Sequence, residues 1–358
     1  MEHKNTYIAI MAGGVGSRFW PSSREKKPKQ FLDILGVGKS LIQLTVERFE
    51  NLVPAKQILI LTNKTYVDLV KEQLPKIPSG NIIAEPRRNN TAPCNALLAL
   101  KVYQKNQDAC IVVAPSDHVI LKEDIFLKNI EKAISYCQNN EVLMTLGIEP
   151  TRPDTGYGYI EMDASESDNE ILKISKFKEK PDEATAKKYL DSGNYVWNAG
   201  IFIWTAKQIL KSFKENENQI LEVLSEDLSQ LNTAKEQAYI DRVYPNTRSI
   251  SIDYAILEKA KNAYTIPSDI DWSDLGTWSS LHAYLPKDGN ENVLLAKNNI
   301  TQEVSNTIIK ADAEKLVVIN GLTDYMVIDE KDALLIYPKS KEQKIKQVRQ
   351  NIEDIRFL

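Results

Sequence analysis

The sequence predicts an α/β protein in which helices cover both faces of a Rossmann-like, mostly parallel sheet. Over residues 1–150, short β-branched runs alternate with longer amphipathic segments. Each strand–helix–strand repeat implies a right-handed crossover, which makes neighbouring strands parallel. Beyond residue 286 the pattern changes to closely spaced β-rich pieces, which predict a small second domain.

The strands predicted in the first part are bounded by polar or turn residues and are Tyr7–Met11, Gln57–Leu61, Asn81–Ala84, Ala109–Ala114 and Val142–Gly147. The helices predicted between them are Leu41–Phe49, Lys64–Leu74, Thr91–Gln104 and Ile125–Gln138. The third helix has a broad apolar surface suited to packing on a sheet.

The middle of the chain predicts paired strands and further helices. We expect strands at Tyr157–Met162, Ile171–Lys178, Gly200–Trp204 and Asn262–Pro267, and helices after Asp182, within Lys207–Tyr239 and at Thr277–Tyr284. The run PKDGN at residues 286–290 is the clearest boundary, so the predicted domains are 1–285 and 286–358. The four short strands expected in the second domain suit a parallel β-solenoid or a mixed sheet, closed by a helix at Lys341–Asn351.

Composition excludes several classes of protein. The chain of 358 residues is 42% hydrophobic and 26% charged, which indicates an ordinary globular protein. A net charge of −4 without a basic stripe argues against nucleic acid as a partner. No apolar run approaches the ~20 residues that cross a membrane. The three cysteines, Cys94, Cys110 and Cys137, lack CxxC spacing and predict reduced core thiols in a cytoplasmic protein.

The segment after the first predicted strand has the composition of a phosphate site. Three glycines at 13, 14 and 16 precede five cations, which are Arg18, Arg24, Lys26, Lys27 and Lys29. Backbone N–H groups beside cations suit a polyphosphate. The spacing fits neither the P-loop nor the dinucleotide fingerprint, in which Phe19 stands at the third glycine, so a Rossmann oxidoreductase is disfavoured. A plain strand-to-loop turn is the alternative, and the density of cations favours phosphate.

Two carboxylates are candidates for holding Mg²⁺. Asp117 follows the strand Ala109–Ala114, and ligands of parallel sheets bind beyond the carboxyl ends of strands. Asp274 or Asp271, within DIDWSDLGTW, could supply the second carboxylate, and Asp274 is the better candidate. Mg²⁺ is usually shared between one or two carboxylates and substrate phosphates. The alternative is a helix or turn cap for Asp117, and a cap of the helix that begins near Thr277 for Asp271 and Asp274.

Weaker signals point to a sugar. Glu179 and Lys180 end a predicted strand before Pro181, where they could bind sugar hydroxyls and a sugar phosphate. Taken alone, they fit an ordinary charged strand end better. The segments Gly156–Glu161 and Trp197–Gly200 place polar groups beside aromatic rings, as carbohydrate sites do.

Together these segments resemble the sugar-nucleotide pyrophosphorylases. The matching motifs run in order from residue 11 to 278 and are GGVGSRFWPSSREKKPKQF, EP…NTAP at Glu85–Pro93, PSDH, GYGYIE, FKEKP, WNAG and DWSDLGTW. The resemblance implies a glycosyltransferase-A-like nucleotidyltransferase domain over residues 1–285. It also implies GTP and mannose 1-phosphate as substrates, Mg²⁺ as cofactor and a homodimer, with neither nucleic acid nor membrane as partner.

The resemblance also implies roles for residues. Ala12, Gly13, Gly14 and Glu85 would surround the nucleobase and ribose, and Arg18, Lys29 and Asp117 would be catalytic. The whole nucleotide set is Ala12, Gly13, Gly14, Gly16, Ser17, Arg18, Lys29, Glu85, Arg88, Asn90, Thr91, Ala92 and Asp117. The sugar-phosphate set is Gly158, Glu179, Lys180, Asn198 and Gly200, and the metal set is Asp117 and Asp274.

One residue departs from the family pattern. Asn89 precedes Asn90-Thr91-Ala92-Pro93, where the family usually has arginine. Either Arg88 takes over from one position away, or nucleotide affinity is lower.

Two alternatives stay open at this point. The same chemistry could use dTTP or UTP with glucose 1-phosphate, although an acceptor such as Glu85 would favour the N1–H and N2–H₂ donors of guanine. A non-catalytic sugar-nucleotide sensor is the other alternative. Loss of Arg18, Lys29, Asp117 or Asp274 would indicate a sensor, and all four are present.

Overall fold

The computed structural model describes residues 4–168 and 170–357, which cluster into two compact units. The first unit comprises Met1–Gly13, Thr45–Ser116 and Ile120–Trp272, and the second comprises Gly14–Leu44, Asp117–Val119 and Ser273–Leu358. These units divide the chain differently from the expected boundary at residue 285, because the segment Gly14–Leu44 clusters with C-terminal residues. A functional domain over residues 1–285 stays a prediction.

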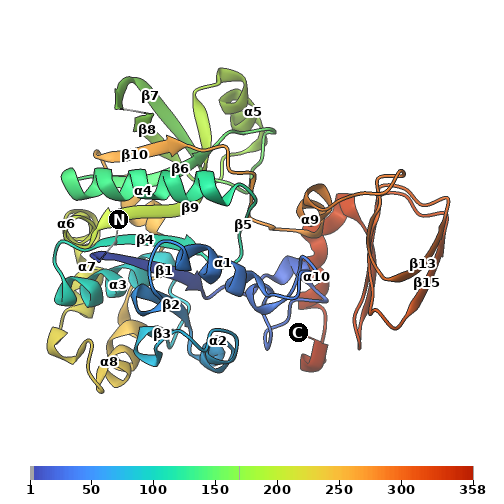
Figure 1. Ribbon diagram of the computed structural model, residues 1–358, viewed down its shortest axis with the longest axis horizontal. Helices are drawn as coiled ribbons and strands as arrows, with labels where there is room; N and C mark the ends of the chain where they lie inside the picture. Colours follow the sequence, from blue (N-terminus) through green and yellow to red (C-terminus); the bar gives the residue numbers. More distant parts are fainter. Residues whose placement is uncertain (1–3, 169, 358) are drawn as a thin grey trace. The chain divides into compact units, whose positions relative to one another are not determined.

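The first unit contains one nine-stranded sheet with the order β3-β2-β1-β4-β9-β6-β10-β8-β7 (Figure 1). Its strands are β1 (Thr6–Ala12), β2 (Ile58–Asn63), β3 (Ile82–Glu85), β4 (Cys110–Pro115), β6 (Leu143–Ile148), β7 (Tyr159–Asp168), β8 (Ile171–Lys178), β9 (Tyr195–Thr205) and β10 (Ala263–Pro267). Strands β8 and β9 are antiparallel to the other seven strands of this sheet. The predicted strands are therefore confirmed, but the antiparallel β9 between β4 and β6 makes the sheet mixed.

The helices of this region follow the predicted pattern. They are α1 (Leu41–Glu50, which begins in the second unit), α2 (Val67–Gln73), α3 (Thr91–Lys105), α4 (Glu123–Asn139), α5 (Glu183–Ser192), α6 (Ala206–Asn216), α7 (Asn218–Leu224) and α8 (Glu236–Val243). Asp182 caps α5 as expected, because its side chain accepts a hydrogen bond from the Thr185 N–H at 2.8 Å. The predicted helix at Lys64–Leu74 is shorter, since Lys64–Tyr66 forms a 3₁₀ turn before α2.

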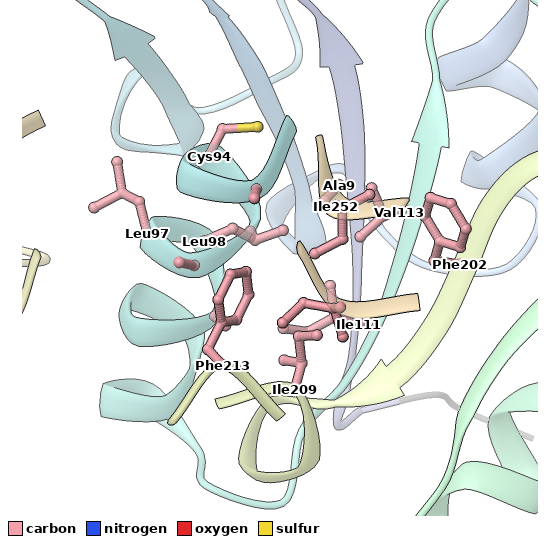
Figure 2. Close-up of a cluster of buried hydrophobic side chains, with 14 of the residues drawn as sticks. Ala9, Cys94, Leu97, Leu98, Ile111, Val113, Phe202, Ile209, Phe213 and Ile252 are labelled. Atoms are coloured by element: carbon pink, nitrogen blue, oxygen red, sulfur yellow. The ribbon is translucent and has the colours of Figure 1, made fainter. Parts of the chain in front are cut away.

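The core of the first unit lies between the sheet and helices α3 and α6. One cluster of buried side chains contains Leu97 and Leu98 of α3, Phe213 of α6, Ile111 of β4 and Phe202 of β9 (Figure 2). Every side chain of α3 from Ala92 to Val102 is buried, so this helix is apolar almost all round, as a core helix must be.

The second unit has a core of its own. Phe19 and Trp20 pack in one cluster with Trp278, Met326 and Ile345. Its elements are α9 (Trp278–Tyr284), α10 (Ile345–Gln350), β12 (Val293–Leu295), β13 (Asn298–Gln302), β14 (Ile308–Lys310), β15 (Leu316–Asn320), β16 (Tyr325–Asp329) and β17 (Leu334–Pro338). The two-residue strands β5 (Val119–Ile120) and β11 (Trp272–Ser273) lie where the chain passes between units.

The β-rich tail forms two sheets. Strands β12, β14 and β16 pair in parallel and β17 adds antiparallel to β16, while β13 and β15 form a separate parallel pair. The expected terminal helix at Lys341–Asn351 is confirmed in part, because residues Lys339–Lys344 are 3₁₀ and only Ile345–Gln350 are α-helical. In the part of the chain that the structure describes, no helix is long and apolar enough to span a bilayer.

Candidate nucleotide and sugar-phosphate sites

The glycines after β1 serve two different needs. Gly16 has φ +64°, and a Cβ there would lie 2.5 Å from Cβ of Lys29, so the fold itself requires glycine. At Gly13 and Gly14, φ is not positive and a Cβ would meet no atom within 4 Å. The fold does not require glycine at these two positions. The space beside them suits the close approach of a ligand to the backbone.

Lys29 is 3% exposed and its ammonium group is fully engaged inside the second unit. Nζ donates to the carbonyl oxygens of Asp274 and Leu275, both at 2.8 Å, and pairs with Oδ2 of Asp117 at 2.9 Å. It also lies 5.4 Å from the centre of the Phe19 ring. These three polar contacts use all three N–H groups. Lys29 therefore connects the cationic segment to both predicted metal ligands, and its contact with a triphosphate stays a prediction.

Neither Asp271 nor Asp274 caps the helix that follows them. Helix α9 is capped by Thr277, which forms a capping box with Ser280, so neither Asp271 nor Asp274 has that role. The Asp274 side chain instead accepts from the N–H of Gly276 at 2.9 Å. Asp271 belongs to the first unit and pairs with Lys122 at 3.3 Å.

Asp117 is held in its charged form. Desolvation acts to raise its pKa, but the charges of Lys29 and His118 and a hydrogen bond from Lys29 lower the pKa below its ordinary value. Among the described residues, no group of three or more His, Cys, Asp or Glu side chains gathers to hold a metal. Lys29 contacts Asp117 through its carboxylate and Asp274 through its backbone carbonyl oxygen. Mg²⁺ is usually shared between one or two carboxylates and substrate phosphates, so carboxylates are suitable ligands for it, and the metal site stays a prediction.

Arg18 has a second cation, Lys346, in its electrostatic surroundings. Its Nε is buried and has no hydrogen-bond partner in the described part of the chain. The charge of Arg18, and then burial, lower the pKa of Lys346 in α10, so the two cations repel each other. Two neighbouring cations repel each other and favour an anion between them. This supports the expected role of Arg18 in phosphate binding.

Glu85 ends β3 in the first unit and is buried. It accepts a hydrogen bond from the hydroxyl group of Tyr244 at 2.8 Å. Burial raises the pKa of Glu85 to about 7, although hydrogen bonds from Tyr244 and Cys94 act in the opposite direction. This carboxyl group therefore titrates near neutral pH.

The other predicted nucleotide residues of this unit have structural partners. Arg88 donates to the hydroxyl group of Tyr66 at 2.6 Å. Asn90 has φ +65° and caps α3, because its side chain accepts from the Thr91 N–H at 3.0 Å. Thr91 Oγ1 accepts from the N–H of Ile252 at 2.8 Å. Ala92 and Ala12 are fully buried and can offer only backbone atoms.

Asn89, the departure from the family pattern, points into the protein. Its Nδ2 donates to the carbonyl oxygens of Tyr244 and Thr247 at 3.1 and 3.2 Å and to Oγ1 of Thr247 at 3.0 Å. Sequence reasoning missed both partners, since the surrounding segment YPNTR carries no motif.

The five predicted sugar-phosphate residues lie just before β7, just after β8 and within β9, and they are Gly158, Glu179, Lys180, Asn198 and Gly200. A Cβ at Gly158 would lie 2.5 Å from Oε2 of Glu179. Glu179 is buried and pairs with Lys180, so it is not an ordinary solvated strand end. Asn198 donates its backbone N–H to the Gly158 carbonyl oxygen at 2.8 Å and accepts from the Gly200 N–H at 3.1 Å.

Asp253 also belongs to this cluster and was not predicted. It accepts a hydrogen bond from Nδ2 of Asn198 at 3.2 Å. Burial, and then the charge of Glu179, raise its pKa to about 6. No sequence pattern marks it, because it lies in a π-helical turn far along the chain.

Comparison with known families identifies the chain. The nucleotidyl transferase family model matches residues 8–291, which is well over half of the sequence. The chain belongs to the nucleotidyl transferase family. A second model, the MannoseP isomerase/GMP-like beta-helix domain, matches residues 297–351. The resemblance inferred from the motifs is thus confirmed.

Individual relatives and solved structures extend this result. The chain is 36% identical over 343 residues to a mannose-1-phosphate guanylyltransferase of Escherichia coli, covering 94% of this chain and 72% of that protein. The crystal structure of a mannose-1-phosphate geranyltransferase from Thermus thermophilus matches with a TM-score of 0.88 and 28% identity, covering 98% and 100% of the two chains. A mannose-6-phosphate isomerase from Helicobacter pylori matches with a TM-score of 0.62 and 26% identity over 75% and 99%.

Proposed function

We propose that this chain joins GTP to mannose 1-phosphate and releases GDP-mannose and pyrophosphate. The observation that carries this proposal is the 36% identity, over 94% of the chain, to a relative named for this activity. The clusters of predicted site residues in each unit support it.

The chemistry needs no protein nucleophile. An ionised phosphate oxygen of mannose 1-phosphate attacks the α-phosphorus of GTP and forms a new P–O bond. The bond from that phosphorus to the bridging oxygen breaks, and pyrophosphate leaves with the electron pair. Because the reactants are anions, the protein's main task is to position them and to offset negative charge.

The second unit contains the groups suited to the phosphates. The backbone beside Gly14 is open to a ligand, and Arg18 offers a guanidinium whose Nε has no partner among the described residues. Asp117 and Asp274 would hold Mg²⁺, which we propose as the cofactor and which would supply positive charge to the phosphates. Lys29 keeps Asp117 charged and in place.

The first unit contains the groups suited to the sugar and the base. Glu179 and Asn198 can accept hydrogen bonds from mannose hydroxyls, and Lys180, whose side chain is 58% exposed, can offset the charge of the 1-phosphate. Glu85 can accept from N1–H and N2–H₂ of guanine, which neither uracil nor thymine presents together.

Three finer features are also part of the proposal. The parallel pairing of β12, β14 and β16 supports a short β-solenoid. Three exposed aliphatic side chains on β13 and β15 support a homodimer through this region, and they are Ile300, Leu316 and Val318. Three buried free cysteines support a cytoplasmic location.

The test is pyrophosphate release with Mg²⁺, with GTP, dTTP, UTP and ATP each crossed with mannose 1-phosphate and glucose 1-phosphate. We expect strong preference for GTP with mannose 1-phosphate. Preference for another pair would keep the chemistry and change the substrates. No pyrophosphate in any combination from a folded sample would favour the sensor, and conversion of mannose 6-phosphate without nucleotide would indicate an isomerase.

A further inference from the structure

A chain of buried hydrogen bonds runs from Asn89 to Glu85 within the first unit. Asn89 donates to the carbonyl oxygens of Tyr244 and Thr247 and to the Thr247 hydroxyl, at 3.0 to 3.2 Å. The Thr247 hydroxyl donates to the Tyr244 carbonyl oxygen at 2.8 Å. The Tyr244 hydroxyl then donates to Oε2 of Glu85 at 2.8 Å. All four residues are at most 8% exposed.

The Tyr244 phenol group is held through the backbone turn that Asn89 binds and through its own hydrogen bond to Glu85. Tyr244 begins the 3₁₀ turn Tyr244–Asn246, and Asn89 binds the carbonyl oxygens at the start of that turn and just beyond its end. Without the Asn89 amide, polar groups of the turn would be buried with fewer partners, which is costly. The turn therefore depends on Asn89, and the position of the Tyr244 hydroxyl depends on the turn.

We propose that Asn89, Thr247 and Tyr244 are positioning residues for guanine selection, because together they fix the plane in which the Glu85 carboxylate accepts hydrogen bonds. This role rests on the function proposed above, in which Glu85 accepts from guanine. The proposal also assigns a role to Asn89, the residue that departs from the family pattern. Asn89 acts through Tyr244 and not through direct contact with the nucleotide.

The positioning role proposed for Tyr244 can be measured through the pH dependence of guanine binding, because the groups around Glu85 set the pKa of its carboxyl group. The titratable groups that face Glu85 are the Tyr244 phenol and the Cys94 thiol. Burial raises the pKa of both above their ordinary values, so both are neutral near pH 7. The Tyr244 hydroxyl favours the ionised form of Glu85. Its removal should raise the pKa of Glu85 further and shift guanine binding to higher pH.

The test compares GTP and UTP affinity between pH 6 and 8.5 for the wild type and Tyr244→Phe. We expect the variant to bind GTP about tenfold more weakly at pH 7, as for loss of a hydrogen bond to a charged group, with UTP affinity unchanged. The midpoint of the pH dependence of GTP affinity should move upward. Ionisation of the nucleotide phosphates is common to both proteins and cancels in the comparison.

Tyr239→Phe is the matched control. Tyr239 is also buried, and its hydroxyl donates to the Leu224 carbonyl oxygen at 2.8 Å, away from Glu85. This variant should lose comparable stability but leave the base preference and the pH midpoint unchanged. A shift as large as that of Tyr244→Phe would mean that general destabilisation causes the effect, and it would overturn the proposal.

Asn89→Ala tests the upstream residue. We expect GTP affinity to fall severalfold in the wild-type background and not to fall further in Tyr244→Phe, since Asn89 acts through Tyr244. Additive losses would overturn this coupling. If Tyr244→Phe does not fold, the pH midpoint of Asn89→Ala decides, because an unchanged midpoint contradicts the proposal.

The base preference of the wild-type protein distinguishes failure of the proposed function from failure of the positioning role. A wild-type protein that does not prefer GTP overturns the proposed function and the positioning role together. A wild type that prefers GTP, with variants of unchanged base ratio and pH midpoint, overturns the positioning role alone.

Discussion

Asp117 in the second unit and Glu85 in the first unit are both carboxyl groups at the ends of strands, yet their surroundings act in opposite directions. Asp117 pairs with a buried lysine, and its pKa lies below the ordinary value. Glu85 is buried beside the Tyr244 hydroxyl and the Cys94 thiol, and burial raises its pKa to about 7. One environment maintains a fixed charge, which suits the phosphate chemistry proposed for Asp117, and the other raises the pKa of the carboxyl group proposed to accept hydrogen bonds from the base.

Lys29→Met should have the largest effect, because it removes the charge that defines the surroundings of Asp117. We expect kcat to fall about 10²–10³-fold, the range for loss of a preorganised electrostatic group. Stability should also fall by about 2–3 kcal/mol, less than for a fully buried pair, since the Asp117 side chain remains 31% exposed. Pyrophosphate release and urea denaturation measure the two effects.

Lys26→Met is the control for this prediction, because Lys26 is an exposed cation of the same segment. It should leave kcat and stability close to wild type. If Lys29→Met keeps near-normal turnover, the assignment of Lys29 and Asp117 to the catalytic group is wrong.

Glu85→Gln should reverse the usual link between function and stability. GTP kcat/KM should fall about 10–100-fold through lost hydrogen bonds to a charged acceptor. The neutral carboxyl group stabilises the fold fully below its unfolded pKa of 4.5, and that contribution is lost as pH rises through about 7. At pH 8 the amide variant should therefore be more stable by up to about 3 kcal/mol.

Denaturant unfolding at pH 5 and pH 8 checks this sign. The advantage of Glu85→Gln should be small at pH 5 and grow toward pH 8. An advantage that does not depend on pH would show that the carboxyl group is already ionised in the folded protein.

A glycine pair has the smallest expected effect on activity and separates a requirement of the fold from a requirement of the ligand. Gly16→Ala should cost about 2–4 kcal/mol of stability, because it combines a positive φ with a Cβ contact of 2.5 Å. Gly14→Ala should change stability by at most about 0.5 kcal/mol yet raise the KM for GTP. Equal stability losses in the two variants, measured by thermal unfolding, would contradict the distinction.

Much of the fold could be predicted because its signals are local. Periodicity located β4 and α3 to within a residue or two, since each buries a continuous apolar run. The reversed direction of β9 could not be predicted, because strand direction depends on which strands become neighbours in the sheet. The division into units was also missed, since it depends on contacts between residues such as Phe19 and Trp278, far apart in the chain.

The candidate site shows the same limit. Glu85, Asp117 and Glu179 stood out because they end strands within recognisable motifs. Tyr244 and Asp253 did not, because their roles arise from single hydrogen bonds to residues more than 50 positions away. The burial of Lys29 was likewise invisible, since its partners are backbone atoms and the carboxylate of another segment.

The shared core of the second unit has a consequence for how the protein matures on the ribosome. Phe19 and Trp20 emerge from the ribosome long before their packing partners Trp278, Met326 and Ile345, since Trp20 and Trp278 are 258 residues apart in the chain. The segment that we propose to bind phosphate therefore has to wait for these later residues before its core can close. A nascent or prematurely terminated chain can complete its large sheet while this segment still lacks its cover, so such a chain should not consume nucleotide.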